Sequence, residues 1–228
     1  MSRERKVVKS KVFEVYESGE GKFKKIYTEN LVPGKKVYGE RLIVQDRTEY
    51  REWNPYKSKL CATIIKGCPN VFIRRNDIVI YLGAASGTTV SHVSDIVGDD
   101  GFVFAMDMAP RVLRELMFLC YDRKNIAPIL ADANKTKETI ERLCMADVIY
   151  QDVAQKDQVD IFLKNIGIFL KDKGYALLAL KARSVDVTRN PRDIFKEVKH
   201  KLEKNLTLVD YREISPFQRD HAMFICKK

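Results

Sequence analysis

Three aspartates follow successive apolar strands predicted in the middle of the chain, where they could bind a small polar ligand. Asp107 follows the strand predicted over residues 102–106 and lies 24 residues after Gly83. An acidic side chain at such a place can accept hydrogen bonds from both hydroxyls of a ribose. Asp132 follows the next strand and Asp152 the one after that. A strand-end aspartate can also cap a helix, but three in register indicate a ligand site at one edge of a sheet.

A glycine-rich turn follows the strand predicted over residues 78–82. It runs from Gly83 to Thr89, and its glycines at 83 and 87 have the spacing GxxxG. Small residues let a ligand approach the backbone, and a helix amino terminus follows directly. The spacing differs from the GxGxxG of a dinucleotide site, which argues against a nicotinamide cofactor. Such a turn can serve packing alone, but with the three aspartates it predicts an adenosyl cofactor.

A lysine and one of these aspartates could handle a proton. Lys181 follows five apolar residues at the end of the strand predicted over 175–180, an unusual place for a solvated charge. Asp152 ends the neighbouring strand, so the sequence predicts an ion pair between the two side chains, which could be only structural. A positioned lysine can act as a general base. We therefore predict that Lys181 accepts a proton from a hydroxyl group of the substrate.

The elements that carry these residues alternate between strands and helices from residue 78 onward. Apolar runs predict strands over 78–82, 102–106, 128–131, 148–150 and 175–180, and helical patterns lie over 89–97, 111–121, 136–143, 159–170 and 191–204. Continuous apolar strands are typical of a parallel sheet that is covered on both faces. Two last strands, over 206–214 and 222–226, have no helix between them and must pair antiparallel or lie apart. This ending is associated with Rossmann-like methyltransferases, so we predict an α/β fold of that class.

The first part of the chain has another pattern. Between Val7 and about Arg51 the apolar residues alternate, with clusters of turn residues between them, and this predicts a small antiparallel β region. A short amphipathic helix is predicted over 56–66. We therefore expect two domains, a small N-terminal antiparallel β domain over residues 1–55 and a Rossmann-like domain over residues 56–228.

Composition limits the partners and the cell compartment. The 228 residues carry a formal net charge of +10, with 15 basic against 9 acidic residues in 1–60 and 12 against 7 in 181–228. If the two ends meet on one face, they form a basic surface suited to nucleic acid, although basic proteins that bind none are common. The sequence predicts no membrane span and no signal peptide. The five cysteines contain no CxxC pair and the three histidines lack ligand spacing, so we expect a cytoplasmic protein without a metal site.

Three segments make the sequence similar to a known family. These are Glu49–Leu60 (EYREWNPYKSKL), Tyr81–Asp95 (YLGAASGTTVSHVSD) and Tyr150–Gln155 (YQDVAQ). They resemble fibrillarin, the S-adenosylmethionine-dependent RNA 2′-O-methyltransferase of box C/D ribonucleoproteins, and the resemblance covers essentially the whole chain. The glycine- and arginine-rich tail of eukaryotic members is absent, so the chain looks like the archaeal form. At the ribose position it carries Asp107 where relatives often carry Glu, which shortens the reach but keeps the chemistry.

The resemblance implies roles for individual residues. The cofactor pocket would be lined by Gly83, Thr88, Thr89, Asp107, Met108, Asp132, Ala133, Asp152, Val153, Ala154 and Gln155. Related ribose 2′-O-methyltransferases share a Lys-Asp-Lys tetrad completed by Glu or His, and the matching positions are Lys59, Asp152, Lys181 and His221. The alternatives stay open: Lys59 could be a surface lysine with Lys57 as the competing choice, and His221 could simply hydrogen-bond within the terminal turn.

The resemblance also implies a reaction and partners. It predicts S-adenosyl-L-methionine as the cofactor and 2′-O-ribose methylation of rRNA and tRNA, with the target chosen by base pairing to a box C/D guide RNA. A Nop-domain scaffold protein and a kink-turn-binding ribosomal-type protein would complete the particle in the cytoplasm of an archaeal cell. The alternative is a catalytically silent RNA-binding structural subunit of the same fold.

Overall fold

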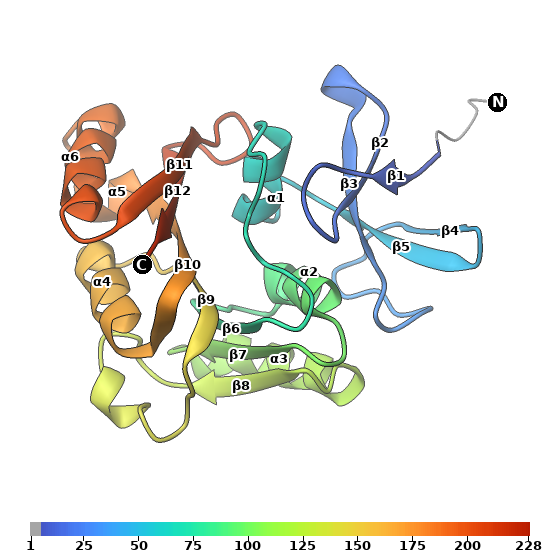
Figure 1. The fold of residues 1–228 in the computed structure, drawn as a ribbon, viewed down its shortest axis with the longest axis horizontal. Helices are drawn as coiled ribbons and strands as arrows, with labels where there is room; N and C mark the ends of the chain where they lie inside the picture. The colour runs from blue at the N-terminus through green and yellow to red at the C-terminus, as the bar shows by residue number, and fades with distance from the viewer. Residues whose placement is uncertain (1–5) are drawn as a thin grey trace.

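The computed structural model describes residues 6–228, which form two β-sheets around a shared core (Figure 1). Residues 1–5, where the predicted N-terminal β domain begins, lie outside the described residues. The N-terminal sheet is antiparallel and has the order β1-β2-β3-β5-β4. Its strands are β1 (Val8–Lys9), β2 (Tyr16–Ser18), β3 (Lys25–Glu29), β4 (Leu42–Gln45) and β5 (Thr48–Trp53), with a 3₁₀ turn η1 (Gly21–Phe23) before β3. The antiparallel β region predicted from the alternating pattern is confirmed.

The second sheet has seven strands in the order β11-β12-β10-β9-β6-β7-β8. They are β6 (Ile78–Leu82), β7 (Phe102–Asp107), β8 (Ile126–Leu130), β9 (Ala146–Gln151), β10 (Leu170–Lys181), β11 (Thr207–Glu213) and β12 (His221–Lys227). The helices are α1 (Lys59–Ile65), α2 (Thr88–Val97), α3 (Pro110–Asp122), α4 (Gln158–Phe169), α5 (Ala182–Val185) and α6 (Pro191–Glu203). Strands β6 to β10 pair in parallel, whereas β12 is antiparallel to both β10 and β11. This confirms the predicted α/β, Rossmann-like fold.

The two faces of the seven-stranded sheet bury alternate residues of each strand. In β6, Val79 and Tyr81 pack on the side of α1, α2 and α3, while Ile80 and Leu82 pack on the side of α4 and α6. Side chains alternate across a strand, so a strand covered on both faces reads as a continuous apolar run. Trp53 of the N-terminal sheet belongs to the same core as α1 and α2. The N-terminal sheet is therefore packed against α1 and α2, which lie on one face of the larger sheet.

The order of the large sheet reverses between β6 and β9. Strand β6 pairs with β7 on one side and with β9 on the other, so the chain fills one half of the sheet before it crosses to the other. In open parallel sheets, ligands bind in the crevice at such a reversal, at the carboxyl ends of the strands. Gly83 directly follows β6 and Asp152 directly follows β9. The fold therefore brings these two residues to the expected ligand crevice.

One predicted helix is wrong. The pattern over 136–143 predicts a helix, but the structure has only a 3₁₀ turn, η2, at Thr136–Glu138. The hydroxyl of Thr139 donates to the carbonyl oxygen of Thr136 at 3.0 Å, which gives the backbone a local alternative to helical bonding. The side chain of Ile140 is 53% exposed, so the segment buries no apolar stripe that would hold a helix in place.

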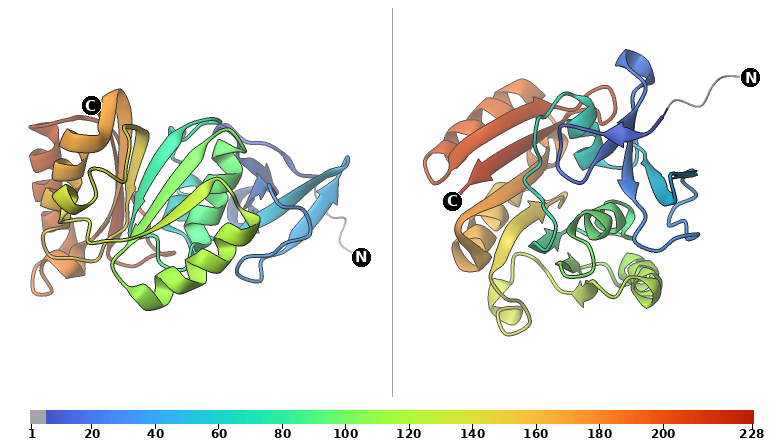
Figure 2. Two further views of the ribbon diagram at one scale, coloured as in Figure 1. Left: turned by 90° about the horizontal axis from the view of Figure 1, so that it is seen from below. Right: turned by 45° about the vertical axis from the view of Figure 1, so that its right-hand side comes forward.

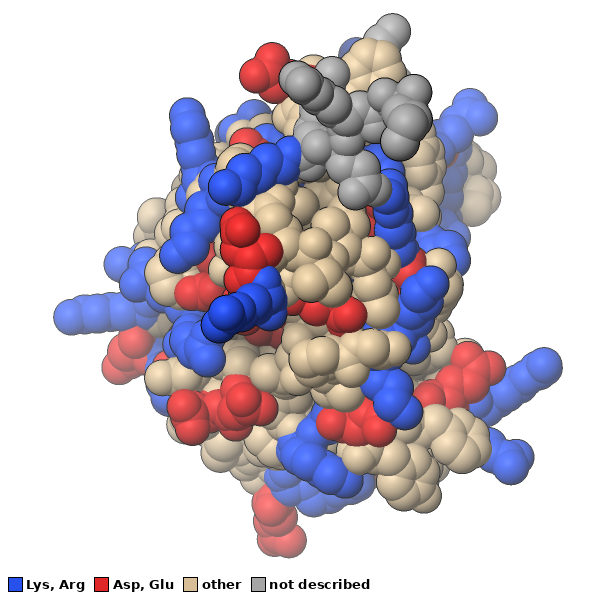
Figure 3. Space-filling model, turned by 90° about the vertical axis from the view of Figure 1, so that its right-hand side faces the viewer, with Lys and Arg blue, Asp and Glu red and all other residues tan. Residues whose placement is uncertain are grey.

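The N-terminal sheet and helix α6, which belong to the two basic segments of the chain, lie at opposite ends of the molecule in every view (Figures 1 and 2). On the face of the N-terminal sheet, Lys and Arg side chains alternate with acidic ones around an uncharged middle (Figure 3). The two segments meet beside α1, where the side chain of Gln218 donates to the carbonyl oxygen of Tyr56 at 2.7 Å, but the N-terminal sheet and α6 do not form the single basic face that the charge distribution suggested (Figures 1 and 2). Among residues 6–228, no helix is long and apolar enough to span a bilayer.

Candidate active site

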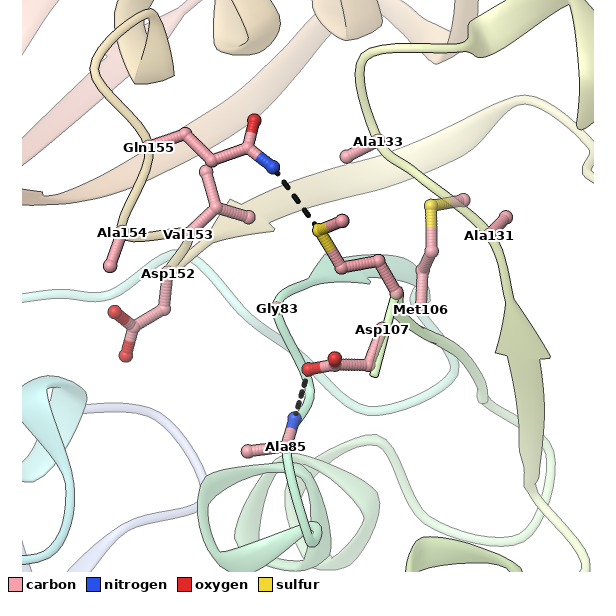
Figure 4. A pocket seen from close by; sticks show the side chains of 11 residues that line it. Gly83, Ala85, Met106, Asp107, Ala131, Ala133, Asp152, Val153, Ala154 and Gln155 are labelled. Atoms are coloured by element: carbon pink, nitrogen blue, oxygen red, sulfur yellow. Dashed lines mark hydrogen bonds between the residues drawn. The ribbon is translucent and has the colours of Figure 1, made fainter. Parts of the chain in front are cut away.

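A cavity of about 270 Å³ lies at the carboxyl ends of β6, β7, β8 and β9 (Figure 4). Its wall is formed by Gly83, Ala85, Met106, Asp107, Met108, Ala131, Ala133, Asp152, Val153, Ala154 and Gln155. Most of the residues predicted to bind the cofactor are in this wall. Ala85, Met106 and Ala131 were not predicted, because their side chains carry no chemical signal in the sequence and the family resemblance did not single them out.

Gly83 allows the ends of β6 and β9 to approach each other. Its φ angle is +84°, and a Cβ at this position would lie 2.3 Å from the carbonyl oxygen of Asp152 and 3.2 Å from Cγ1 of Val153. The peptide N–H of Asp152 donates to the carbonyl oxygen of Leu82 at 2.8 Å. This part of the cavity is therefore built from backbone held at close range, with room that a side chain would fill.

Asp107 presents its carboxylate to the cavity from the end of β7. One oxygen accepts from the N–H of Ala85 at 2.8 Å and the other from the N–H of Ala109 at 2.9 Å. An ionised carboxylate has about four acceptor positions, so each oxygen can accept a further hydrogen bond. The arrangement fits two neighbouring hydroxyl groups, as in a ribose. Across the cavity, the amide of Gln155 donates to Sδ of Met108 at 3.3 Å (Figure 4).

Three residues predicted to bind the cofactor lie outside this wall. Thr89 is buried, and its hydroxyl donates to Oγ of Ser58 at 3.0 Å. Thr88 is the first residue of α2, and its carbonyl oxygen accepts from the hydroxyl of Ser91 at 2.9 Å. Asp132 lies between two wall residues, but its carboxylate accepts from the N–H of Asn134 at 2.9 Å and closes a local turn.

The residues predicted as a catalytic tetrad come close together around Asp152, which lines the cavity. Nζ of Lys59 donates to both carboxylate oxygens of Asp152 at 2.8 Å, and both side chains are about one-fifth exposed. Lys181 and His221 are register partners at the end of the β10–β12 ladder. The ring of His221 is near enough to Lys59, Asp152 and Lys181 for all three charges to affect its pKa. The four side chains therefore share one electrostatic environment.

The ion pair of Asp152 differs from the sequence prediction. The sequence predicts a pair with Lys181, but the structure pairs Asp152 with Lys59, and no Lys181–Asp152 ion pair occurs within residues 6–228. Strands β9 and β10 last pair at Gln151 and Leu178. Lys181 lies three residues further along β10 and is exposed, whereas Lys59 reaches Asp152 from the first turn of α1.

Ser58 sets the position of Lys59. It is the N-cap of α1, and its buried hydroxyl oxygen accepts from a backbone N–H of the first turn at 3.4 Å and from the hydroxyl of Thr89 at 3.0 Å. These two bonds fix the start of α1 against α2. Helix α1 therefore begins at Lys59 and not at residue 56 as predicted. The competing Lys57 points elsewhere, with its Nζ 3.4 Å from the carbonyl oxygen of Tyr38.

His221 is held as a neutral base. Burial lowers the pKa of His221, and the charges of Lys59 and Lys181 lower it further, against the opposing effects of the hydrogen bond to Arg219 and of the Asp152 carboxylate. Nδ1 lies 2.7 Å from the carbonyl oxygen of Arg219, which can only accept, so Nδ1 carries the proton. Nε2 is then the acceptor atom of the ring.

A buried charge network joins the N-terminal sheet to α2 and α3. Arg51 on β5 contacts Glu40 at 2.7 Å and Asp95 on α2 at 2.8 Å, and Arg123 after α3 contacts the same Asp95 at 2.6 Å. All four side chains are at most 1% exposed. Each charge is paired, which is the condition under which buried charges are tolerated. The network anchors the helix that begins beside the cavity.

His92 on α2 adds neutral contacts to this network. Its Nδ1 lies 2.7 Å from the hydroxyl of Thr28 and its Nε2 lies 2.7 Å from the hydroxyl of Tyr38. Because Thr28 donates to Asp95, it accepts from the Nδ1–H of His92. Burial, followed by the charges of Arg51 and Arg123, holds the pKa of His92 well below its usual value. Within the described residues, no group of three or more His, Cys, Asp or Glu could hold a metal ion.

The reversed strand order with its cavity, followed by a last strand inserted antiparallel, defines the class of Rossmann-like methyltransferases. A family model described as Fibrillarin matches residues 6–228. The chain belongs to the fibrillarin family.

Three known proteins illustrate the similarity. A protein of Methanocaldococcus jannaschii named fibrillarin-like rRNA/tRNA 2′-O-methyltransferase is 49% identical over 222 residues, which cover 94% of this chain and 96% of that protein. A structure of Aeropyrum pernix fibrillarin in complex with natively bound S-adenosyl-L-methionine is 42% identical, covers 97% of each chain and has a TM-score of 0.88. A fibrillarin/Nop5p complex is 38% identical, covers 94% of this chain and 97% of that one, and has a TM-score of 0.84.

Proposed function

We propose that this protein is an S-adenosyl-L-methionine-dependent RNA 2′-O-methyltransferase, which methylates ribose in rRNA and tRNA under the direction of a box C/D guide RNA. The observation that carries the proposal is the position of the Lys59–Asp152 pair, since Asp152 both lines the cavity and belongs to the cluster of predicted catalytic residues. The names of the similar proteins support the cofactor, the reaction and the RNA substrates.

The cavity wall suits this cofactor. Asp107 would accept hydrogen bonds from the ribose hydroxyls, and the small and apolar residues Ala133 and Val153 would contact the base. Gly83 would leave room for the ligand to approach the backbone. When bound, S-adenosyl-L-methionine supplies an electrophilic methyl group on its sulfonium sulfur.

The protein then has two tasks, to position the target hydroxyl and to accept its proton. Lys181, which is exposed beside His221, would accept the proton of the target hydroxyl. Asp152 would orient the reacting groups, because Lys59 holds both of its oxygens. His221 offers an acceptor nitrogen in the same environment.

The proposed particle also contains protein partners. The fibrillarin/Nop5p complex supports a Nop-domain scaffold protein. The kink-turn-binding ribosomal-type protein follows from the family resemblance alone. Since the similar proteins are archaeal, we propose that the particle acts in the cytoplasm of an archaeal cell.

A methyl-transfer assay tests the proposal. Tritium from S-adenosyl-L-methionine labelled in its methyl group should appear in the 2′-O-methyl group of a target RNA only when guide RNA and scaffold are present. A target that is mismatched to the guide at the modified position is the control. Cofactor binding without any transfer in the complete particle would refute the enzymatic function and would favour a silent structural subunit.

A further inference from the structure

The buried side-chain amide of Gln158 contacts the backbone N–H and C=O of Lys181 from the side of β9. Gln158, the first residue of α4, has no exposed surface. Its Oε1 accepts from the N–H of Lys181 at 3.2 Å, and its Nε2 donates to the carbonyl oxygen of Lys181 at 3.2 Å. The same Nε2 donates to the carbonyl oxygen of Gln155 at 3.0 Å. One side chain thus binds both backbone groups of one residue.

The sheet explains why this contact is needed. In an extended strand, the N–H and C=O of one residue point to the same side. For Lys181 that side faces β9, but β9 has already ended at Gln151. The amide of Gln158 therefore takes the place of the missing strand and gives hydrogen-bond partners to two backbone groups that β9 leaves unpaired. The side-chain amide of Gln151 in turn donates to the backbone carbonyl of Gln158.

The contact links two parts of the site. The carbonyl oxygen of Gln155 accepts from the same amide nitrogen of Gln158. Gln155 lies in the wall of the cavity, and its own side chain contacts Met108 across the cavity. Lys181 lies beside His221 at the end of β10. The orientation of the Lys181 peptide sets the direction in which its side chain leaves the strand. Gln158 is thus the described residue that connects the cavity wall directly to the backbone of Lys181.

We propose that Gln158 is a positioning residue, which holds Lys181 at a fixed place relative to Gln155 in the cavity wall so that the amine of Lys181 can reach the target hydroxyl. This inference rests on the proposed role of Lys181. Replacement of Gln158 should slow methyl transfer with little change in cofactor affinity. A displacement of about 1 Å at a reacting group typically costs up to about 100-fold in rate, so we expect a loss of roughly 10- to 100-fold.

A double-mutant cycle separates positioning from a general loss of structure. Single-turnover methyl transfer is measured in the assembled particle for wild type, Gln158→Met, Lys181→Ala and the double variant. If Gln158 acts through Lys181, Gln158→Met slows the wild type but has no further effect in the Lys181→Ala background. The control is Asn165→Leu, which removes a buried amide of the same helix that donates to the carbonyl oxygens of Ala133 and Ile161. Its effect should be equal in both backgrounds.

The outcomes distinguish the two proposals. Equal losses from Gln158→Met in both backgrounds would overturn the positioning role and leave the proposed function intact. A Lys181→Ala variant as fast as wild type would refute the proton-acceptor role itself. If Gln158→Met does not fold, Gln158→Glu takes its place in the cycle, since an ionised carboxylate keeps the acceptor for the N–H of Lys181 but loses the donor to its carbonyl oxygen.

Discussion

Replacing Gly83 with alanine tests whether close backbone packing builds the cofactor cavity. Two costs are expected. An L-residue at φ +84° costs about 1–2 kcal/mol of folding free energy. The new Cβ would also lie 2.3 Å from the carbonyl oxygen of Asp152, where ordinary contact begins at 3.4 Å, so Asp152 must move by roughly 1 Å. Overpacking of this kind adds about 1–3 kcal/mol, giving a total loss of about 2–5 kcal/mol.

The matched control is Gly39→Ala. Gly39 has the same φ of +84°, but a Cβ there would have nothing within 4 Å, so this variant carries only the conformational cost of about 1–2 kcal/mol. Urea denaturation measures the difference between the two variants. Because Asp152 carries the contact to Lys59, Gly83→Ala should also slow single-turnover methyl transfer about 100-fold, whereas Gly39→Ala should not. Equal stability and equal rates for the two variants would show that the close approach of Gly83 to Asp152 contributes neither to stability nor to methyl transfer.

Three further predictions concern individual side chains. Asp107→Ala should weaken cofactor binding by about 1.5–3 kcal/mol in calorimetry, and unchanged affinity would remove Asp107 from the site. Lys181→Ala should slow single-turnover transfer by about 10²–10⁴-fold while cofactor affinity stays within a few fold; a wild-type rate would point to another proton acceptor. The pKa of His92 is well below 6.5 in the folded protein, so as pH falls below that value the unfolded chain binds a proton that the folded protein does not. Stability should therefore fall by up to about 1.4 kcal/mol per pH unit until the folded pKa is reached, and His92→Gln should remove this part of the pH dependence in urea denaturation. Parallel curves for wild type and variant would contradict it.

The large sheet could be predicted from the sequence because its strands are apolar on both faces. A run of consecutive apolar residues such as Ile78–Leu82 is buried on both sides when it forms a strand of a sheet that is covered on both faces. Asp107 and Asp152 could be expected at one edge of the sheet for the same reason, since the end of a strand fixes the edge at which the next residue lies, whereas Asp132 lies outside the cavity wall. The helix over 136–143 could not be excluded, because its pattern is apolar enough and the competing hydroxyl bond of Thr139 leaves no trace in periodicity.

Contacts between residues far apart in the chain could not be predicted from the sequence. The partner of Asp152 depends on where α1 begins, which Ser58 and Thr89 decide together across 31 positions of the chain. In the sequence, Gln158 is only a polar residue at the start of a helix. Its role depends on β9 ending before β10 does, which the sequence does not show. Arg51 and Arg123 count as surface charge in any composition argument, and only the fold buries them.

The buried charge network constrains the order in which the protein can be completed during synthesis. Arg51 precedes Asp95 by 44 residues, and Asp95 precedes Arg123 by 28. The N-terminal sheet leaves the ribosome first, but it cannot bury Arg51 in its final place until Asp95 has followed. The second arginine partner of Asp95, Arg123, is synthesised later still. The complete set of ion pairs at this interface therefore requires the chain up to Arg123, and a nascent chain shorter than 123 residues should keep the interface hydrated and open to proteases.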